Sequence, residues 1–136
     1  MKADTQTETE VLATLNEAME AYKRRDMDAL LGYLAPGQEV IQFGMSVANA
    51  KRIGREALKA EFENDWAASE AASCDIGWHS VSTAGSAAWV AAEAQFHWKE
   101  AGEPEETIPA RLTVVFEKRD GRWLWVHSHF SIPIED

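Results

Sequence analysis

The hydrophobic period of the chain changes once, close to Cys74, and this change restricts the fold more than any other feature. Before Cys74, apolar residues recur every three or four positions, as in an amphipathic helix. After it, apolar and polar residues alternate, which is typical of strands with one buried face. A block of helices followed by a block of strands predicts an α+β domain, with the helices packed on one face of an antiparallel sheet.

The N-terminal half predicts three helices and one short strand. The first helix begins at a capping box formed by Thr7 and Glu10 and ends in the cations of residues 23–25, and Asp26 caps a second, short helix. A strand at 39–43 and a loop or irregular hairpin at 44–54 precede a third helix at 55–69. Four strands follow from Cys74, with turns at AGS and KRDGR and a longer acidic connection, AGEPEETIP. The predicted order is α-α-β-(β)-α-β-β-β-β, in a single domain of residues 1–136.

Charge and composition argue against several classes of function. A net charge of −10 is unfavourable for a nucleic-acid partner, which would need a basic surface. The single cysteine excludes an internal disulfide. No apolar run approaches the roughly 18 residues of a membrane span, and the N-terminal MKADTQTETE is polar and acidic, unlike a signal peptide. We therefore expect a cytoplasmic protein with neither nucleic acid nor membrane as a partner.

The last predicted strand, in RWLWVHSHFSIPIED, carries His127 and His129 two residues apart. Strict alternation along a strand places both imidazoles on one face, together with Trp123 and Trp125. Because both faces of this strand are bulky, we expect it to lie between two layers. Buried imidazoles require hydrogen-bond partners, and the neighbouring strand must supply them.

The turn between the last two strands decides which residues face these histidines. A three-residue turn with Gly121 as its bulge places Arg111 opposite His129 and Thr113 opposite His127, whereas a two-residue turn moves Arg111 to the other face. We favour the three-residue turn because it gathers these polar side chains into one cluster, in the concave part of the sheet opposite the helices. It also leaves a uniformly apolar second face.

Three segments of the chain resemble a known family. The sequence ARLTVVFEKRDGRWLWVHSHFSIP resembles the closing hairpin of the SnoaL-like family, within the nuclear-transport-factor-2-like superfamily of cone-shaped α+β barrels. GREALKAEF is similar to the third helix of that family and AGSAAWVAAE to one of its strands, so the resemblance extends from about Thr7 to Pro133. The closing VHSHFS is also similar to the end of the calcium/calmodulin-dependent kinase II association domain. The resemblance implies a cystatin-like cone with a strongly curved sheet, and a homodimer formed through that sheet.

The resemblance implies two classes of function. The superfamily includes ketosteroid isomerases, scytalone dehydratase, limonene epoxide hydrolase and polyketide cyclases, alongside non-catalytic transport and assembly modules. The first hypothesis is therefore a small-molecule-binding domain with an internal pocket, acting as an isomerase, cyclase or dehydratase by general acid/base catalysis on a largely apolar substrate. The alternative is a non-catalytic ligand-binding or dimerisation module. No mid-strand Asp matches the isomerase base, which argues against ketosteroid isomerisation itself.

The candidate catalytic residues are His127, His129 and Arg111. A histidine or a pocket glutamate would be the general base, and Arg111 or the second histidine would stabilise developing negative charge. If a dimer partner covers this face, the cluster is instead a hydrogen-bonded interface patch. The His-x-His spacing suits a metal, but nothing else in the chain has ligand spacing, so we expect neither metal nor cofactor. The candidate ligand-binding residues are Trp66, Glu93, Thr113, Trp125, Tyr33 and His79, and the hydroxyl of Tyr22 is a further group within reach of a pocket.

Overall fold

The structure is a computed structural model that describes residues 1–45 and 50–134. Its helices are α1 (Thr5–Lys23), α2 (Met27–Gly32) and α3 (Arg55–Ala68). Its strands are β1 (Ile41–Phe43), β2 (Lys51–Ile53), β3 (Ala71–Ala84), β4 (Ala87–Lys99), β5 (Glu106–Arg119) and β6 (Arg122–Ser131). The element order predicted from the sequence is confirmed, and within these residues no helix is long and apolar enough to cross a membrane.

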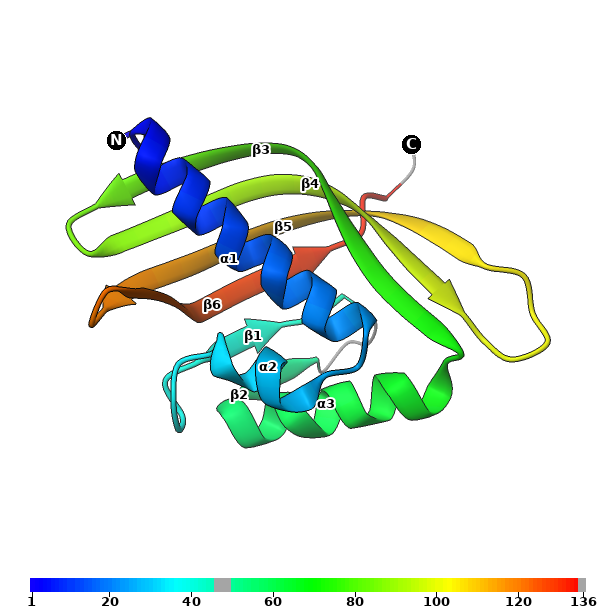
Figure 1. The fold of residues 1–136 in the computed structure, drawn as a ribbon. Helices are drawn as coiled ribbons and strands as arrows, with labels where there is room; N and C mark the ends of the chain where they lie inside the picture. The colour runs from blue at the N-terminus through cyan, green and yellow to red at the C-terminus, as the bar shows by residue number, and fades with distance from the viewer. Residues whose placement is uncertain (46–49, 135–136) are drawn as a thin grey trace.

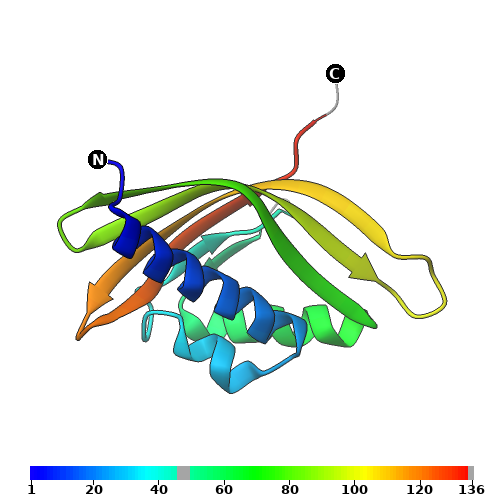
Figure 2. The ribbon, with the colours of Figure 1, turned by 45° about the horizontal axis from the view of Figure 1, so that its top comes forward.

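The strands form one six-stranded sheet in the order β2-β1-β6-β5-β4-β3. All neighbouring strands are antiparallel except β1 and β6, which run parallel. The sheet curves strongly, and the helices lie on its concave side, with α1 crossing the long strands (Figure 1). Figure 2 shows the sheet arching over the helices, so that its convex side faces away from them. The prediction of helices on one face of a curved antiparallel sheet is therefore confirmed.

Side-chain caps fix the ends of the first two helices. The N-cap of α1 is Asp4, whose Oδ1 accepts a hydrogen bond from the backbone N–H of Thr7 at 2.7 Å. The predicted capping box at Thr7 is wrong, because the helix begins at Thr5 and the carboxylate of Asp4 caps it one turn earlier. Asp26 caps α2 as predicted, with its Oδ1 accepting from the N–H of Ala29 at 3.1 Å.

The start of α3 depends on a glycine instead of a side-chain cap. Gly54 has φ 95°, in the left-handed region, and its N–H donates to the carbonyl of Val40 at 2.7 Å. A Cβ atom at this position would lie 3.2 Å from the carbonyl oxygen of Gly37. Only glycine meets both requirements without strain, so the backbone at Gly54 sets where α3 begins.

The β5–β6 hairpin differs from the predicted one in two respects. Its turn has two residues, Asp120 and Gly121, both with positive φ, so the favoured three-residue turn is wrong. The register also shifts by one residue: Phe116 pairs with Trp125 but Val115 pairs with His127, which leaves Val126 unpaired as a β-bulge.

The bulge at Val126 changes the faces of β6. Trp123 and Trp125 point into the core, with exposed fractions of 9% and 5%, whereas His127 and His129 point to the convex side of the sheet. The histidines and the tryptophans are therefore on opposite faces, because one unpaired residue interrupts the alternation. His129 is exposed and His127 is half-buried, so no second layer covers them within the described chain.

The hydrophobic core lies between α1, α3 and the concave face of the sheet. Five residues whose hydrophobic periodicity in the sequence predicts a core position are buried: Leu58, Phe62, Leu112, Val114 and Phe116. Phe116 is fully buried and packs edge-on against Trp125, with ring centroids 5.8 Å apart. The apolar face of β5 therefore meets the helices.

Truncation of the two faces of β5 should have unequal effects. Phe116→Ala should lower the free energy of unfolding by about 3–5 kcal/mol, because it removes a fully buried ring and leaves a cavity. Val115→Ala, next to it on the convex side, should cost about 1 kcal/mol or less. Urea denaturation of both variants measures this difference, and a Phe116→Ala loss below about 1 kcal/mol would contradict the assigned face.

Candidate functional site

A cavity of about 360 Å³ lies between the helices and the concave face of the sheet. This volume is within the range of small-molecule sites, about 300–1,000 Å³. Most of its wall is apolar, and the large side chains include Phe62, Phe96, Trp98, Ile108, Trp125 and Phe130. Its polar side chains are Tyr22, Gln42, Glu61 and Asp65. A few polar groups in an apolar wall are the usual composition of a ligand pocket.

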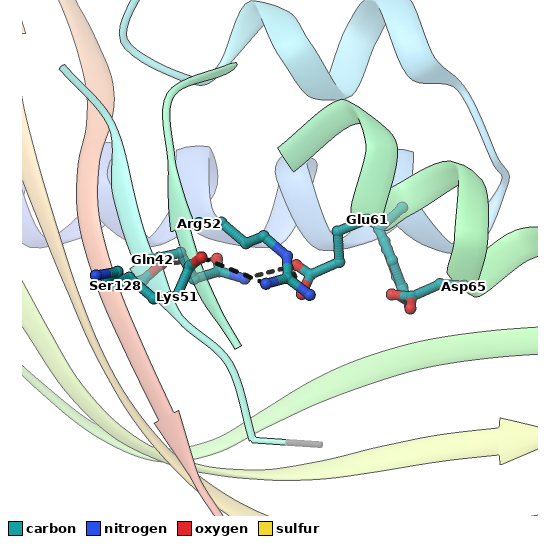
Figure 3. A network of polar contacts seen from close by, with 7 residues as sticks. Gln42, Lys51, Arg52, Glu61, Asp65 and Ser128 are labelled. Atoms are coloured by element: carbon teal, nitrogen blue, oxygen red, sulfur yellow. Dashed lines mark hydrogen bonds and ion pairs between the residues drawn. The ribbon is translucent and has the colours of Figure 1, made fainter. Parts of the chain in front are cut away.

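The two carboxyl groups come from one face of α3. Glu61 and Asp65 are four residues apart, so they project from successive turns on the same side of the helix. Figure 3 shows both side chains leaving α3, with the Glu61 carboxylate turned toward Gln42 of β1 and Arg52 of β2. Gln42 Nε2 donates to Glu61 Oε2 at 3.2 Å, and Arg52 Nε lies 3.5 Å from Glu61 Oε1.

A hydrogen bond between Tyr22 and Asp65 joins α1 to α3. The Tyr22 hydroxyl donates to Asp65 Oδ2 at 2.9 Å, and the Tyr22 side chain is buried. The tyrosine ring packs against Phe62 and Trp66, with centroids 5.9 Å away in each case. Within the described residues, Tyr22 is the one hydrogen-bond partner of the Asp65 carboxylate. The pair therefore places a carboxylate and a phenol side by side in the cavity wall.

Burial raises the pKa of both carboxyl groups above their ordinary values. For Asp65, burial is the main cause, and the hydrogen bond from Tyr22 and the charge of Arg52 oppose it. For Glu61, burial and then the charge of Asp65 raise the pKa, while Arg52 lowers it. Burial and the charge of Asp65 also raise the pKa of Tyr22, so its hydroxyl stays protonated at neutral pH. The cavity thus holds carboxyl groups of increased basicity next to a neutral donor.

A chain of hydrogen bonds sets the orientation of the Gln42 amide. Trp125 Nε1 donates to Ser128 Oγ at 2.9 Å, and Ser128 Oγ lies 2.8 Å from Gln42 Oε1. Because an indole N–H only donates, the proton of the fully buried Ser128 hydroxyl must point to Gln42 Oε1. The NH₂ group of Gln42 then faces Glu61. The bulge at Val126 is what turns Ser128 inward to make this chain.

The three residues predicted as catalytic gather on one face with Thr113, a predicted ligand-binding residue, but that face is the convex side of the sheet. Arg111, Thr113 and His129 are exposed, and His127 is half-buried with its Nδ1 2.8 Å from the carbonyl oxygen of Ile41. The expectation that they occupy the concave side is wrong, because the inward positions of β5 and β6 belong to the core residues and to Ser128. None of the four lines the cavity. The convex side that carries Arg111, Thr113, His127 and His129 is called the outer face.

Both candidate tryptophans lie at or near the cavity. Trp125 lines it, although strict alternation placed this residue with the histidines. Trp66 is half-buried and stacks on Phe62 with ring centroids 6.2 Å apart. It therefore packs behind a residue that lines the cavity. The tryptophans therefore belong to the helix-facing side of the molecule.

The other three candidates lie away from the cavity. The Tyr33 hydroxyl donates to Glu17 at 3.2 Å near the surface. Glu93 is exposed on β4, and His79 is exposed on β3, with its Nδ1 3.0 Å from the carbonyl oxygen of Gly77. Across residues 1–45 and 50–134, no three His, Cys, Asp or Glu side chains come together to hold a metal ion.

Sequence reasoning missed Gln42, Glu61 and Asp65. The two acids flank the apolar stripe of α3, where charged residues normally indicate a solvated helix face. The i, i+4 spacing of the two acids beside Phe62 and Trp66 could have indicated a pocket, because it places both acids on one side of the helix near large apolar residues. Gln42 lies in a strand of three residues, too short to reveal its inner face.

The sequence matches the SnoaL-like domain over residues 11–135, so the chain belongs to this family. No curated protein matches the chain. A nuclear transport factor 2 (NTF2-like) superfamily protein from Salmonella enterica superimposes with a TM-score of 0.86 at 14% identity, over 98% of this chain and 95% of that one. Solved structures with a cystatin-like fold match as well.

Two further similar structures carry provisional functional names. One is a provisionally named dehydratase of the NTF2-like family from Streptomyces avermitilis, with a TM-score of 0.83 at 17% identity over 93% of this chain and 97% of that one. The other is a provisionally named calcium/calmodulin-dependent protein kinase II association domain from Xanthomonas campestris, with a TM-score of 0.82 at 24% identity over 99% and 96% of the two chains. At these identities the similarity defines the fold alone.

Removal of the Tyr22 hydroxyl should raise the pKa of Asp65 further. The hydrogen bond from Tyr22 stabilises the ionised carboxylate, so Tyr22→Phe removes an interaction that lowers this pKa. Carboxyl ¹³C chemical shifts of Asp65 measured against pH would show the change. Tyr33→Phe is the matched control, because it removes a hydroxyl bound to Glu17 and should leave the pKa of Asp65 unchanged.

The same shift has a consequence for stability. The folded state holds the Asp65 proton more tightly than the unfolded state, so this group favours folding fully below the ordinary pKa of 3.8. Its contribution falls as the pH rises through the raised folded pKa. In Tyr22→Phe this fall should extend to higher pH, and an unchanged or lower pKa of Asp65 would contradict the described hydrogen bond.

Proposed function

We propose that the cavity binds a small, largely apolar molecule and acts on it by general acid/base catalysis. Asp65 is the general base, and the Tyr22 hydroxyl is the hydrogen-bond donor to a substrate oxygen. The observation that carries this proposal is the Tyr22–Asp65 contact of 2.9 Å inside a mainly apolar cavity. A base and a neutral donor this close are able to contact adjacent atoms of one substrate.

The chemistry is proton abstraction from a carbon next to a carbonyl group. The C–H proton passes to a carboxylate oxygen of Asp65, and the bonding electrons move onto the carbonyl oxygen. Tyr22 redirects its hydrogen bond to that oxygen and stabilises the developing negative charge. Many isomerases, cyclases and dehydratases of carbonyl compounds begin with this step, which requires no cofactor.

Two further features support this assignment. Burial raises the pKa of Asp65 toward neutral pH, where a carboxylate is a more effective base. The raised pKa of Tyr22 keeps its hydroxyl in the donor form throughout the same pH range. The provisional dehydratase name of the Streptomyces avermitilis protein belongs to the same class of chemistry.

Hydrogen exchange at carbon tests the proton-abstraction step directly, whatever reaction follows it. Cyclic ketones that fit the cavity are incubated with the protein in D₂O, and the loss of their α-proton signals is followed by NMR. The protein should accelerate exchange of at least one ketone, and Asp65→Asn should slow that exchange by about 10²–10⁴-fold. Glu63→Gln, on the exposed side of α3, is the control and should exchange at the wild-type rate. Equal rates with Asp65→Asn and the wild type would show that Asp65 is not the base.

A second candidate function is self-association through the outer face. Phe43 is 40% exposed and Ile53 49%, and the Phe43 ring lies 5.5 Å from that of His129. Apolar and aromatic side chains beside imidazoles in an exposed sheet resemble an interface more than a solvated surface. We propose a homodimer with this face at its centre. The association-domain name of the Xanthomonas campestris protein supports this interpretation.

A charge on the outer face should separate such a dimer. Phe43→Asp places a carboxylate in the middle of the proposed interface, so it should convert the dimer to monomer in sedimentation experiments at micromolar concentration. Ala60→Asp adds the same charge on the exposed side of α3 and should remain dimeric. Sedimentation of the wild type as a monomer would overturn the dimer proposal.

A further inference from the structure

The cavity wall has an excess of negative charge. Of the described residues that line it, none is Lys, Arg or His, whereas Glu61 and Asp65 are both acids. Cys74 also lines the cavity, but burial raises its pKa to about 12, so its thiol is neutral. Arg52 approaches from β2 and offsets the charge of Glu61. Among the described residues, the Asp65 carboxylate accepts a hydrogen bond from the neutral Tyr22 and forms no ion pair.

Two other cations close to this end of α3, Arg25 and Lys99, have partners elsewhere. Arg25 Nη1 donates to the carbonyl of Trp66 at 2.7 Å, and its Nη2 donates to the carbonyl of Ser69 at 2.9 Å. Lys99 forms an ion pair with Glu70 at 2.7 Å. Both contacts hold the cation at the surface end of the helix. Neither side chain is among those that line the cavity.

The apolar wall is rich in aromatic rings. Tyr22 and Phe62 meet edge to face with centroids 5.9 Å apart, and Phe96 and Trp98 stack at 6.2 Å. Aromatic faces attract cations through their quadrupole, most strongly where water is excluded. A wall of aromatic rings beside a carboxylate whose hydrogen-bond partner is a neutral phenol is therefore complementary to a positive charge attached to an apolar body.

We infer that the ligand of this cavity carries a protonated amine on a flat apolar body. This inference rests on the proposed function, because it names the substrate class of the same site. The ammonium group would lie beside the carboxyl groups of α3, with the apolar body against the aromatic wall. It would also stabilise the negative charge that forms on the substrate oxygen, a role that no cation of the described wall fills. An anionic ligand would instead be repelled by the two acids.

Three indole compounds of nearly equal shape distinguish the effect of ligand charge on affinity from the effect of ligand shape. Tryptamine carries an ammonium group, tryptophol a hydroxyl and indole-3-acetate a carboxylate. Titration calorimetry, with backbone amide shifts to locate the site, should show tryptamine bound about 10–100-fold more tightly than tryptophol. Indole-3-acetate should bind most weakly.

Variants of the acids test the source of this preference. Asp65→Asn and Glu61→Gln should each reduce the affinity for tryptamine and leave the affinity for tryptophol nearly unchanged. Glu63→Gln removes an equal charge from the exposed side of the same helix and should change neither affinity. Retention of the tryptamine preference in both Asp65→Asn and Glu61→Gln would overturn the inference.

Two further outcomes separate the inference from the proposed function. Equal binding of all three compounds would overturn the amine preference but leave acid/base chemistry in the cavity intact. If none of them binds, the inference is wrong, and the exchange of cyclic ketones decides the proposed function independently.

Discussion

One unpaired residue, Val126, decides what each side of the sheet presents. Without this bulge, strict alternation would turn His127 and His129 toward the helices together with Trp125, and Ser128 would face outward. With it, Ser128 enters the interior and links Trp125 to Gln42. The imidazoles move to the outer face. The polar chain of the cavity and the exposed cluster of the sheet therefore both follow from a single shift of register.

The fold could be predicted from the sequence because the hydrophobic period, and its change near Cys74, is a property of whole segments of the chain. Residues such as Leu112, Val114 and Phe116 repeat the same signal, so an error at one position does not change the conclusion. The β5–β6 turn and the bulge at Val126 could not be predicted in this way. Val126 lies in a run of bulky residues, where an unpaired position does not interrupt any visible alternation of apolar and polar residues. The length of the turn at Asp120 then changes the pairing of everything that follows it.

The site was harder to predict from the sequence than the fold, for a different physical reason. Glu61 and Asp65 are charged residues on an amphipathic helix, and such residues normally contact water. Here the curved sheet arches over the helices (Figure 2), and Glu61 and Asp65 line the cavity beneath it, where they lose part of that contact. The raised pKa values of both groups result from this enclosure, which destabilises their ionised forms. Tyr22, 43 residues earlier in the chain, restores one hydrogen bond to Asp65. Chemistry of this kind depends on the distance between elements that no local pattern encodes.

The single cysteine of the chain, Cys74, lies in the cavity wall, and its buried thiol is protonated at neutral pH. A protonated thiol reacts slowly with alkylating reagents, and a reagent reaches Cys74 only through the hollows that this residue lines. Because no other thiol competes, a molecule that covers Cys74 inside the cavity should slow the modification of the chain. The native chain thus carries its own reporter of whether the cavity is occupied.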